Sequence, residues 1–344
     1  MKITTVGIDL AKNVFQVHAV NEAGKKVFNK QLRRDQMAEF FAQLPACLIG
    51  MEACGSAHYW ARKLTGFGHT VRLMAPQFVK PYVKTNKNDM ADAEAICEAV
   101  TRPNMRFVPI KNIEQQSVLA LHRVRQGFVK QRTAQANQIR GLMAEFGLII
   151  PQGIAHITGR VPELIEDALN ELTGQFRLLI ERLLQHFKEL DRQVEETEAL
   201  IKAWHKQNLA SRKLEKIPGI GPITASALVA SVGDAKSFDN GRQLAAWLGL
   251  VPRQHSSGGK NNLLGISKRG DAYLRTLLIH GARALIYAKQ KSADKTGWLH
   301  HLLERKKTNV AAVALANKNA RIVWALLVKD RTFRDDYTPD KAFV

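Results

Sequence analysis

Residues 4–20, TTVGIDLAKNVFQVHAV, contain two short apolar runs rich in β-branched and aromatic residues. Lys12 and Asn13 separate the two runs, as the turn of a β-hairpin does. The first run ends in a carboxylate, Asp9, and a carboxylate at the end of an apolar strand is unusual unless it has a function. We therefore expect the chain to begin with an antiparallel pair of strands and to place a candidate functional group at the end of the first.

The segments that follow extend this pattern into a mixed α/β domain over residues 1–110. Residues 25–33, KKVFNKQLR, are a candidate third strand, and residues 47–53, CLIGMEA, are a further strand that ends near a second carboxylate, Glu52. A helical segment comes next, and TVRLMAP at 70–76 begins another strand. This alternation of strands and helices is typical of a ribonuclease-H-like domain.

The rest of the chain is expected to be mainly helical. Within residues 111–206, apolar residues recur every three or four positions from Leu172 to Trp204, as they do along the seam of a coiled coil. Such a seam packs either on its own domain or on another subunit, and the spacing alone does not decide between them. Residues 207–331 are expected to form a second, mainly α-helical globular domain, and residues 332–344 a polar tail.

The charge of the chain indicates its partner. Among 344 residues, 51 are Lys or Arg and 31 are Asp or Glu, which gives a formal net charge of +20. A surplus of this size favours polyanions, and nucleic acid is the expected partner because phosphate neutralisation supplies much of non-specific affinity. The sequence has no continuous apolar run of about 18 residues, so we expect no membrane span. The 3 cysteines include no CxxC pair, which disfavours disulfides and structural zinc and favours a cytoplasmic location.

Four carboxylates in the N-terminal domain form a candidate metal site. Asp9 and Glu52 end apolar strands, and Asp89 and Asp92 lie three residues apart at the start of an expected helix in KNDMADAEAI (87–96), so they share a helix face. Hard carboxylate oxygens suit Mg²⁺, which in paired sites stabilises the attacking and leaving oxygens of phosphoryl transfer. Taken singly, the residues have simpler explanations, because Asp89 can cap its helix and Asp9 can belong to a turn.

Two glycine-containing loops in the C-terminal domain are candidate nucleic-acid contacts. IPGIGPITA at 217–225 has the form of a helix-hairpin-helix turn, in which Gly219 and Gly221 let the backbone approach a phosphate. An ordinary turn between packed helices is the alternative. HSSGGK at 255–260 is either a solvated turn or a loop that exposes a hydroxyl nucleophile.

Taken in order, GIDLAKN, MEACGSAHYW, KNDMADAEAI, IPGIGPITA and WLGLVPRQHSSGGKNNLLGISKRGDAYLR resemble the insertion-sequence-110 family of transposases, especially its insertion-sequence-1111 subgroup. The resemblance covers nearly the whole chain. It implies an N-terminal RuvC-like domain whose four acids are Asp9, Glu52, Asp89 and Asp92, the same four that the residue types indicate. It also implies a C-terminal transposase domain whose serine nucleophile, which directly precedes a glycine, is Ser257.

The resemblance implies a transposase or site-specific recombinase that cuts and rejoins DNA, with Mg²⁺ or Mn²⁺ as its cofactor. Family members are thought to work with a noncoding guide RNA, made from the element, that pairs with donor and target DNA. We therefore expect DNA and such an RNA as partners, a homo-oligomer (dimer or tetramer), no membrane, and a bacterial cytoplasmic location at the nucleoid.

Under this hypothesis the serine attacks a DNA phosphorus and the metal bound by the acids activates it, if the two domains meet within one chain or across subunits. The cations close to the loop in sequence, Arg253, Lys260, Lys268 and Arg269, are candidates to hold the phosphates. A basic loop in contact only with solvent is the alternative for each of them.

Two other functions fit parts of the sequence. A RuvC-like, structure-selective nuclease would use the four acids and metal-activated water, and it would form no covalent intermediate. It would have no use for the serine loop. A non-enzymatic DNA-binding protein would use the helix-hairpin-helix alone, but clustered acids weaken DNA binding unless a metal is present.

Overall fold

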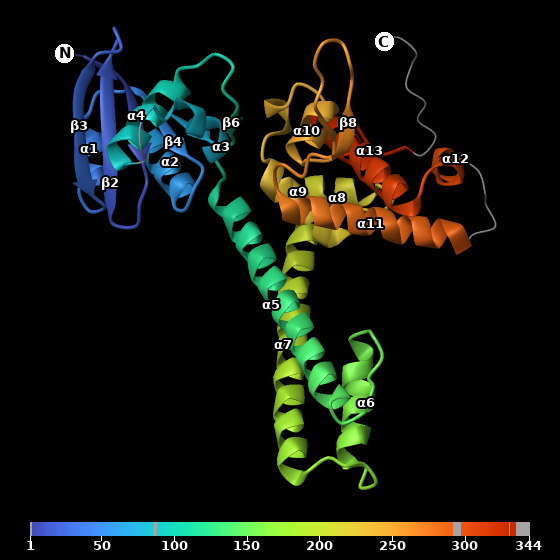
Figure 1. Ribbon diagram of the computed structural model, residues 1–344. Coiled ribbons are helices and arrows are strands. Elements are labelled where there is room, and N and C mark those ends of the chain that lie inside the picture. Colours follow the sequence, from blue (N-terminus) through green and yellow to red (C-terminus); the bar gives the residue numbers. More distant parts are fainter. Residues whose placement is uncertain (1, 85–87, 292–296, 330, 335–344) are drawn as a thin grey trace. The chain divides into compact units, whose positions relative to one another are not determined.

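The computed structural model describes residues 2–84, 88–291, 297–329 and 331–334. By internal contacts the chain divides into two compact units, Met1–Glu114 and Gln115–Val344 (Figure 1). The expected polar tail lies outside the described residues from position 335 onward.

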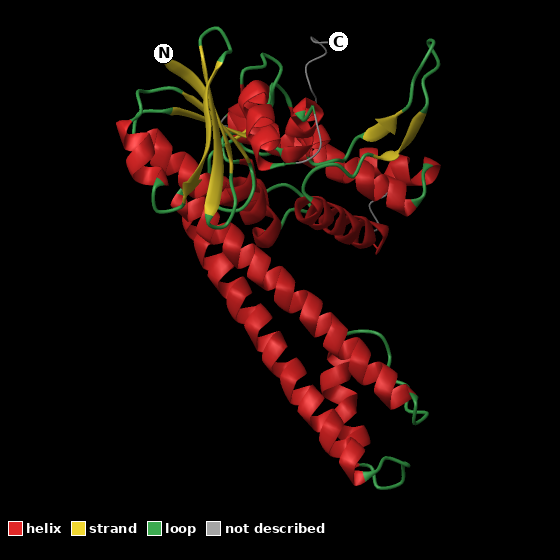
Figure 2. Ribbon diagram, turned by 60° about the vertical axis from the view of Figure 1, so that its left-hand side comes forward, coloured by secondary structure: helices red, strands yellow, loops and turns green. Residues whose placement is uncertain are grey.

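The first unit is built on a mixed sheet, whose strands are yellow in Figure 2. The sheet has six strands in the order β3-β2-β1-β4-β5-β6. The strands are β1 (Ile3–Asp9), β2 (Val14–Asn21), β3 (Lys26–Arg33), β4 (Leu48–Glu52), β5 (Thr70–Met74) and β6 (Phe107–Val108). β1 and β2 form the expected antiparallel hairpin, and β3 pairs antiparallel with β2. β4 is parallel to both β1 and β5, while β6 is antiparallel to β5. The prediction of a mixed α/β N-terminal region is therefore confirmed.

Helices cover both faces of this sheet. Side chains alternate between the two faces along each strand, and each face carries residues that pack against a helix. Val6 and Ile8 of β1 are fully buried in a core shared with α1 (Met37–Gln43) and α2 (Ala57–Gly66). Gly7 and Gly50 face the other side, which α4 (Asp89–Val100) covers. Between β5 and α4 the chain forms the short helices α3 (Pro76–Val79) and η1 (Lys80–Tyr82).

The missing side chain of Gly7 allows α4 to lie directly on β1. A Cβ atom at this position would lie 2.2 Å from the carbonyl oxygen of Ala93 and 2.4 Å from the amide nitrogen of Cys97. Both atoms belong to the backbone of α4, so no rotamer change could relieve the clash. The glycine therefore fixes where α4 crosses the sheet.

Where the structure describes it, the second unit is mainly helical and contains the hairpin of β7 and β8, so the prediction of a mainly helical C-terminal half is confirmed. Its elements are α5 (Ile113–Ala144, which begins at the unit boundary), α6 (Ala155–Glu166), α7 (Gly174–Gln207), α8 (Leu209–Glu215), α9 (Pro222–Val232), η2 (Ala235–Ser237), α10 (Gly241–Trp247), β7 (Pro252–Gln254), β8 (Leu263–Ile266), α11 (Ala272–Lys291), α12 (Trp298–Arg305) and α13 (Thr308–Val328).

The long helices α5 and α7 run in opposite directions, and α6 packs at their far end (Figures 1 and 2). Ion pairs from Arg125 to Glu198 and from Arg132 to Asp191 join the two long helices. The apolar seam of α7 is buried against residues of the same chain, in a cluster that comprises Ala136, Ile139, Met143, Ile150, Ile157, Val161, Leu172, Ile180, Leu184 and Phe187. Packing within the chain, one of the two alternatives for the seam, therefore accounts for this part of it.

Leu179 is one of the apolar residues at the expected spacing of three or four between Leu172 and Trp204, but it lies outside the buried seam. Leu179 is 45% exposed, whereas its neighbour Ile180 is fully buried. An α-helix has 3.6 residues per turn, so residues at a strict 3.5-residue repeat gradually rotate around the helix. The residues that a partner buries therefore differ slightly from those of the repeat. Here α6 supplies that partner at the start of α7.

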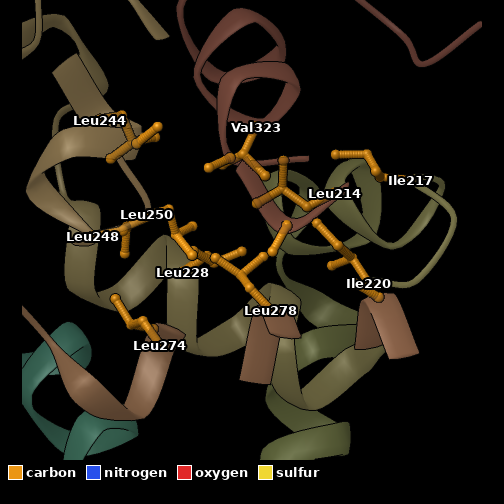
Figure 3. Packing of buried hydrophobic residues seen from close by; sticks show 14 of the residues in the cluster. Leu214, Ile217, Ile220, Leu228, Leu244, Leu248, Leu250, Leu274, Leu278 and Val323 are labelled. Carbon is orange, nitrogen blue, oxygen red and sulfur yellow. The ribbon is translucent and has the colours of Figure 1, made fainter. Parts of the chain in front are cut away.

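The C-terminal helices enclose a second core, formed by leucine, isoleucine, alanine and valine side chains of α8, α9, α10, α11 and α13 (Figure 3). α13 is long and apolar enough to cross a membrane by length and composition alone. However, its Leu315 and Val323 pack in this core, and its Asn319 donates a hydrogen bond of 2.9 Å to the carbonyl oxygen of Pro218. α13 therefore has the contacts of a core helix.

A buried histidine joins α5 to the C-terminal helices. His122 is 1% exposed, and its Nε2 lies 3.1 Å from the hydroxyl of Ser226 in α9. Because that hydroxyl donates its own proton to the carbonyl oxygen of Pro222 (2.8 Å), Nε2 of His122 is the donor. Nδ1 then accepts from the hydroxyl of Tyr273 in α11, at 2.9 Å. Burial, together with the charge of Arg125, lowers the pKa of His122 from 6.5 to about 4, so the ring is neutral at pH 7.

Replacing Gly7 by alanine should destabilise the first unit by about 3 kcal/mol or more, because the new methyl group must displace the backbone of α4. Urea-dependent hydrogen exchange of the β1 and β2 amides measures this change. The matched control is Gly66→Ala at the end of α2, where a Cβ meets nothing within 4 Å. That substitution should leave stability unchanged or raise it by up to about 1 kcal/mol. Equal effects of the two substitutions would contradict the close contact.

The neutral state of His122 should make the second unit sensitive to acid. Since the pKa is lowered on folding, the unfolded chain binds more protons between pH 6.5 and about 4. Stability is then complete above pH 6.5 and falls by about 1.4 kcal/mol for each pH unit below it. His122→Gln keeps a hydrogen-bond donor and an acceptor but does not titrate. The difference in unfolding free energy between wild type and variant should therefore change by about 1.4 kcal/mol for each pH unit between pH 6.5 and about 4. Parallel pH curves for the two proteins would show that folding does not lower the pKa of His122.

Candidate functional site

Asp9 and Glu52 end two neighbouring parallel strands. Ile8 of β1 stands opposite Met51 of β4, so the next residue of each strand is one of the two acids. Both acids have the strand parity of Gly7 and Gly50, and so they project on the face that α4 covers. Both are half-buried. The parallel register thus brings together two carboxylates that lie far apart in the sequence.

Asp89 and Asp92 lie in the first turn of α4, as the sequence predicts. The helix is capped by Asn88, whose side-chain oxygen accepts a hydrogen bond of 2.8 Å from the amide of Ala91. Capping by Asp89, the simpler explanation considered for that residue, is therefore wrong. The contact of Gly7 with Ala93 and Cys97 holds the middle of α4 over β1, the strand that ends in Asp9.

The four acids do not form one coordination shell in this structure. Within the described ranges, no group of three or more His, Cys, Asp or Glu side chains is placed so that it could hold a metal ion. The register of β1 with β4 brings Asp9 next to Glu52, and the first turn of α4 brings Asp89 next to Asp92. All four present carboxylate oxygens, the donors that suit a divalent cation such as Mg²⁺.

The thiol of Cys54 is sensitive to the charge of the acids that end β1 and β4. Although the residue is exposed as a whole, desolvation of its sulfur raises the pKa of the thiol, and the charges of Glu52 and then Asp9 raise it further. The thiol is therefore protonated at neutral pH and is a poor nucleophile.

A polar network of Gln16, His18 and Asn29, which adds to the four predicted acids, lies on the same face of the sheet. Gln16 stands opposite Asp9 and donates to the side-chain oxygen of Asn29, and the amide of Asn29 lies 3.1 Å from Nδ1 of His18. Burial lowers the pKa of His18, so its ring is neutral at pH 7. The sequence contained a signal, because Gln16 and His18 alternate with apolar residues in β2, but their partner depends on the register with β3.

The stretch HSSGGK forms the tip of the hairpin β7–β8. Gly258 and Gly259 both have positive φ, 55° and 76°, and the amide of Lys260 donates to the carbonyl oxygen of Ser257 at 3.0 Å. This is the geometry of a type I′ turn, so the glycines are needed for the fold of the hairpin. All residues from Pro252 to Gly265 are exposed.

The two serines of this tip differ in their contacts. The hydroxyl of Ser256 accepts a hydrogen bond of 2.8 Å from the side chain of Gln254. Ser257 pairs with Lys260 through its backbone, at the first position of the turn. The structure thus engages the side chain of Ser256 and presents Ser257 at the exposed end of the hairpin.

The base of the hairpin is anchored by close backbone contacts. A Cβ at Gly249 would lie 2.0 Å from the carbonyl oxygen of Arg269, and one at Gly270 would lie 1.9 Å from that of Trp247. The guanidinium of Arg275 donates to the carbonyl oxygens of Leu248 and Arg269, at 3.0 and 3.3 Å. The four cations predicted to hold phosphates are all exposed, namely Arg253, Lys260, Lys268 and Arg269.

The turn IPGIGPITA connects α8 to α9, as expected, but its two glycines differ. Gly219, at φ 86°, packs on α11, and a Cβ at Gly281 of that helix would lie 1.9 Å from its carbonyl oxygen. Gly221 is exposed at the N-terminal cap of α9, where a Cβ would meet nothing within 4 Å. Helix packing therefore explains Gly219, while Gly221 adjoins the free amides of the first turn of α9.

Comparison with known proteins identifies both parts of the chain. A transposase family model named for the DEDD acids of IS110 elements matches residues 6–147, and the model described as "Transposase IS116/IS110/IS902 family" matches residues 211–296.

Similar proteins cover nearly the whole chain. A Pseudomonas aeruginosa protein named "Probable family 20 transposase" is 52% identical over 97% of this chain and 99% of its own length. The transposase of the element IS1111A from Coxiella burnetii is 46% identical over 96% of this chain and 92% of its own. A pilin gene-inverting protein of Moraxella bovis is 25% identical over 97% of this chain and 98% of its own.

Together, the matched family models and these relatives show that the chain belongs to the IS110 family of insertion-sequence transposases, enzymes that cut and rejoin DNA.

Proposed function

We propose that this transposase cuts DNA with the hydroxyl of Ser257 as its nucleophile. The observation that carries the proposal is the hairpin tip, which exposes Ser257 while Gln254 occupies the neighbouring hydroxyl of Ser256. The serine oxygen forms a bond to a DNA phosphorus, and the bond from that phosphorus to a deoxyribose oxygen breaks. The serine proton passes to a base, and the released sugar oxygen takes up a proton. Attack by the sugar hydroxyl of another strand end reverses these steps and frees the serine.

We propose that Asp9, Glu52, Asp89 and Asp92 hold a divalent metal, Mg²⁺ or Mn²⁺. The adjacent ends of β1 and β4 and the first turn of α4, which provide carboxylate oxygens on one face of the sheet, support this assignment. When bound, such an ion lowers the pKa of an attacking hydroxyl and stabilises the charge of the phosphoryl group. The acids and the serine then act in the same reaction.

The strand order supports a RuvC-like, ribonuclease-H-like fold for the first unit. Three antiparallel strands, β3, β2 and β1, continue into the parallel strands β4 and β5, and α4 crosses one face. The sheet edge that carries Asp9 and Glu52 is the carboxyl end of parallel strands, where open α/β sheets place their ligands.

The partners of the reaction follow from its chemistry and from the charge of the chain. DNA is the substrate of the family, and we extend the proposal to a noncoding guide RNA, which the net charge of +20 would accommodate. Exchange between two duplexes breaks several strands, and each chain has one Ser257, so we propose a homo-oligomer. The seam of α7 does not support this point, because much of it packs within the chain. Acting on DNA, the enzyme works in the cytoplasm.

A RuvC-like nuclease that uses metal-activated water is the second candidate, and it would need only the four acids. A non-enzymatic DNA-binding protein is contradicted by the family. The relative named for gene inversion favours strand exchange over simple cleavage, because an inversion must rejoin what it cuts.

A covalent protein–DNA adduct distinguishes the two enzymatic mechanisms. Incubation with end-labelled element DNA and Mg²⁺, followed by denaturing electrophoresis and peptide mass mapping, should place a nucleotide on Ser257. Ser257→Ala should reduce adduct formation by at least about 10³-fold, because the nucleophile is absent. Ser256→Ala is the matched control and should retain the adduct. Asp9→Asn should abolish it with the serine in place.

Cleaved DNA without an adduct on any serine would replace the serine mechanism by hydrolysis. Retention of cleavage in Ser257→Ala would lead to the same conclusion.

A further inference from the structure

An exposed aromatic ring stands at the sheet edge that carries Asp9 and Glu52. Tyr59 lies in the first turn of α2, and its side chain is 46% exposed. Only the short loop 53–56 separates α2 from the end of β4. The first turn of α2 therefore begins at the same edge of the sheet as the acids.

Two buried rings hold Tyr59 in place. Tyr59 packs edge-on against Trp60, with centroids 5.2 Å apart, and Trp60 packs edge-on against Phe15 at 5.5 Å. Trp60 is 2% exposed, and Phe15 is fully buried. Phe15 precedes Gln16, the residue opposite Asp9. The exposed ring is thus tied to the strand that lines the acid edge, and its orientation is largely set before any ligand binds.

Two cations flank this row of rings. Nζ of Lys63 lies 5.9 Å from the ring of Tyr59 and 5.7 Å from that of Trp60. The guanidinium of Arg34 lies 5.8 Å from the ring of Trp60, and its Nε donates a hydrogen bond of 2.9 Å to the carbonyl oxygen of Lys12. Lys12 belongs to the turn that follows Asp9. Lys63 therefore borders the exposed ring of Tyr59, and Arg34 borders the buried ring behind it. Through Lys12, Arg34 is also tied to the turn that follows Asp9, at the edge of the sheet where the acids lie.

We propose that Tyr59, Lys63 and Arg34 form a stacking platform for an unpaired base of the DNA strand that enters the acid site. An exposed ring stacks on a base only when that base is not paired within a duplex, and the cations contact the flanking phosphates. Because every base has an aromatic face, this contact positions the strand without reading its sequence. The platform rests on the proposed role of the acids, and it adds a binding function at their edge.

Photo-cross-linking tests the platform without requiring cleavage. The full-length protein with Mg²⁺ is irradiated with single-stranded DNA that carries 5-iododeoxyuridine at successive positions, and the cross-linked peptide is mapped by mass. The cross-link should fall on Tyr59. Tyr59→Ala should remove it and weaken binding of the single strand by about 5-fold to about 150-fold, with duplex binding unchanged. Tyr59→Phe keeps the ring and should retain the affinity.

Tyr287 is the matched control. It is 61% exposed, and Nζ of Lys291 lies 4.4 Å from its ring, but it belongs to α11 in the second unit. Tyr287→Ala should leave the affinity for the single strand unchanged. Lys63→Gln should weaken binding and reduce its salt dependence, because one phosphate contact is lost.

The outcomes separate the platform from the catalytic proposal. A cross-link on Tyr59 together with no adduct on Ser257 would keep the platform and remove the serine mechanism. An adduct on Ser257 with no cross-link on Tyr59 would overturn only the platform. Equal loss of single-strand and duplex binding in Tyr59→Ala would also overturn it, and so would a cross-link obtained with iodinated RNA but not with DNA.

Discussion

The contact between the backbone of Gly7 and that of α4 is the constraint on which the first unit depends. The helix can reach the strand only where no Cβ intervenes, and its backbone atoms lie within 2.4 Å of where that Cβ would be. The contact therefore fixes both the height of α4 above the sheet and its position along β1. Asp9 lies two residues beyond the contact, and Asp89 lies one helical turn before Ala93. One glycine thus controls the separation between acids that come from the sheet and acids that come from the helix.

The second unit combines a rigid base with an exposed end. Backbone contacts at Gly249 and Gly270 and the guanidinium of Arg275 hold the base of the hairpin. Beyond this base, the hairpin tip depends on its own turn and on a few strand hydrogen bonds. Small residues are therefore required twice, at the base for close packing and at the tip for positive φ. A nucleophile carried on such an element can reach a substrate without disturbing the core behind it.

Local patterns in the sequence were sufficient for the hairpin of β1 and β2, for the start of α4, and for the helical C-terminal half. These features depend on periodicity and on residues near in sequence. Features that depend on distant partners were not predictable. Gly219 packs on Gly281 of another helix, and the partner of Gln16 is set by the register with β3. Leu179 is exposed because the packing of α6 determines which side of α7 is buried, and the sequence of α7 does not reveal this partner. Asn88 rather than Asp89 caps α4, and because both residue types cap helices the sequence alone does not choose between them.

The antiparallel helices α5 and α7, with α6 at their far end, form a long helical arm. α7 has 34 residues, which at 1.5 Å per residue corresponds to about 50 Å. Hydrogen bonds of His122 connect the base of this arm to α9 and α11, and a separate apolar cluster packs α5, α6 and α7 together at its tip. Whole turns removed from both helices together would therefore shorten the arm while leaving both fastenings intact. The length of the arm is therefore independent of the contacts that hold its base and its tip.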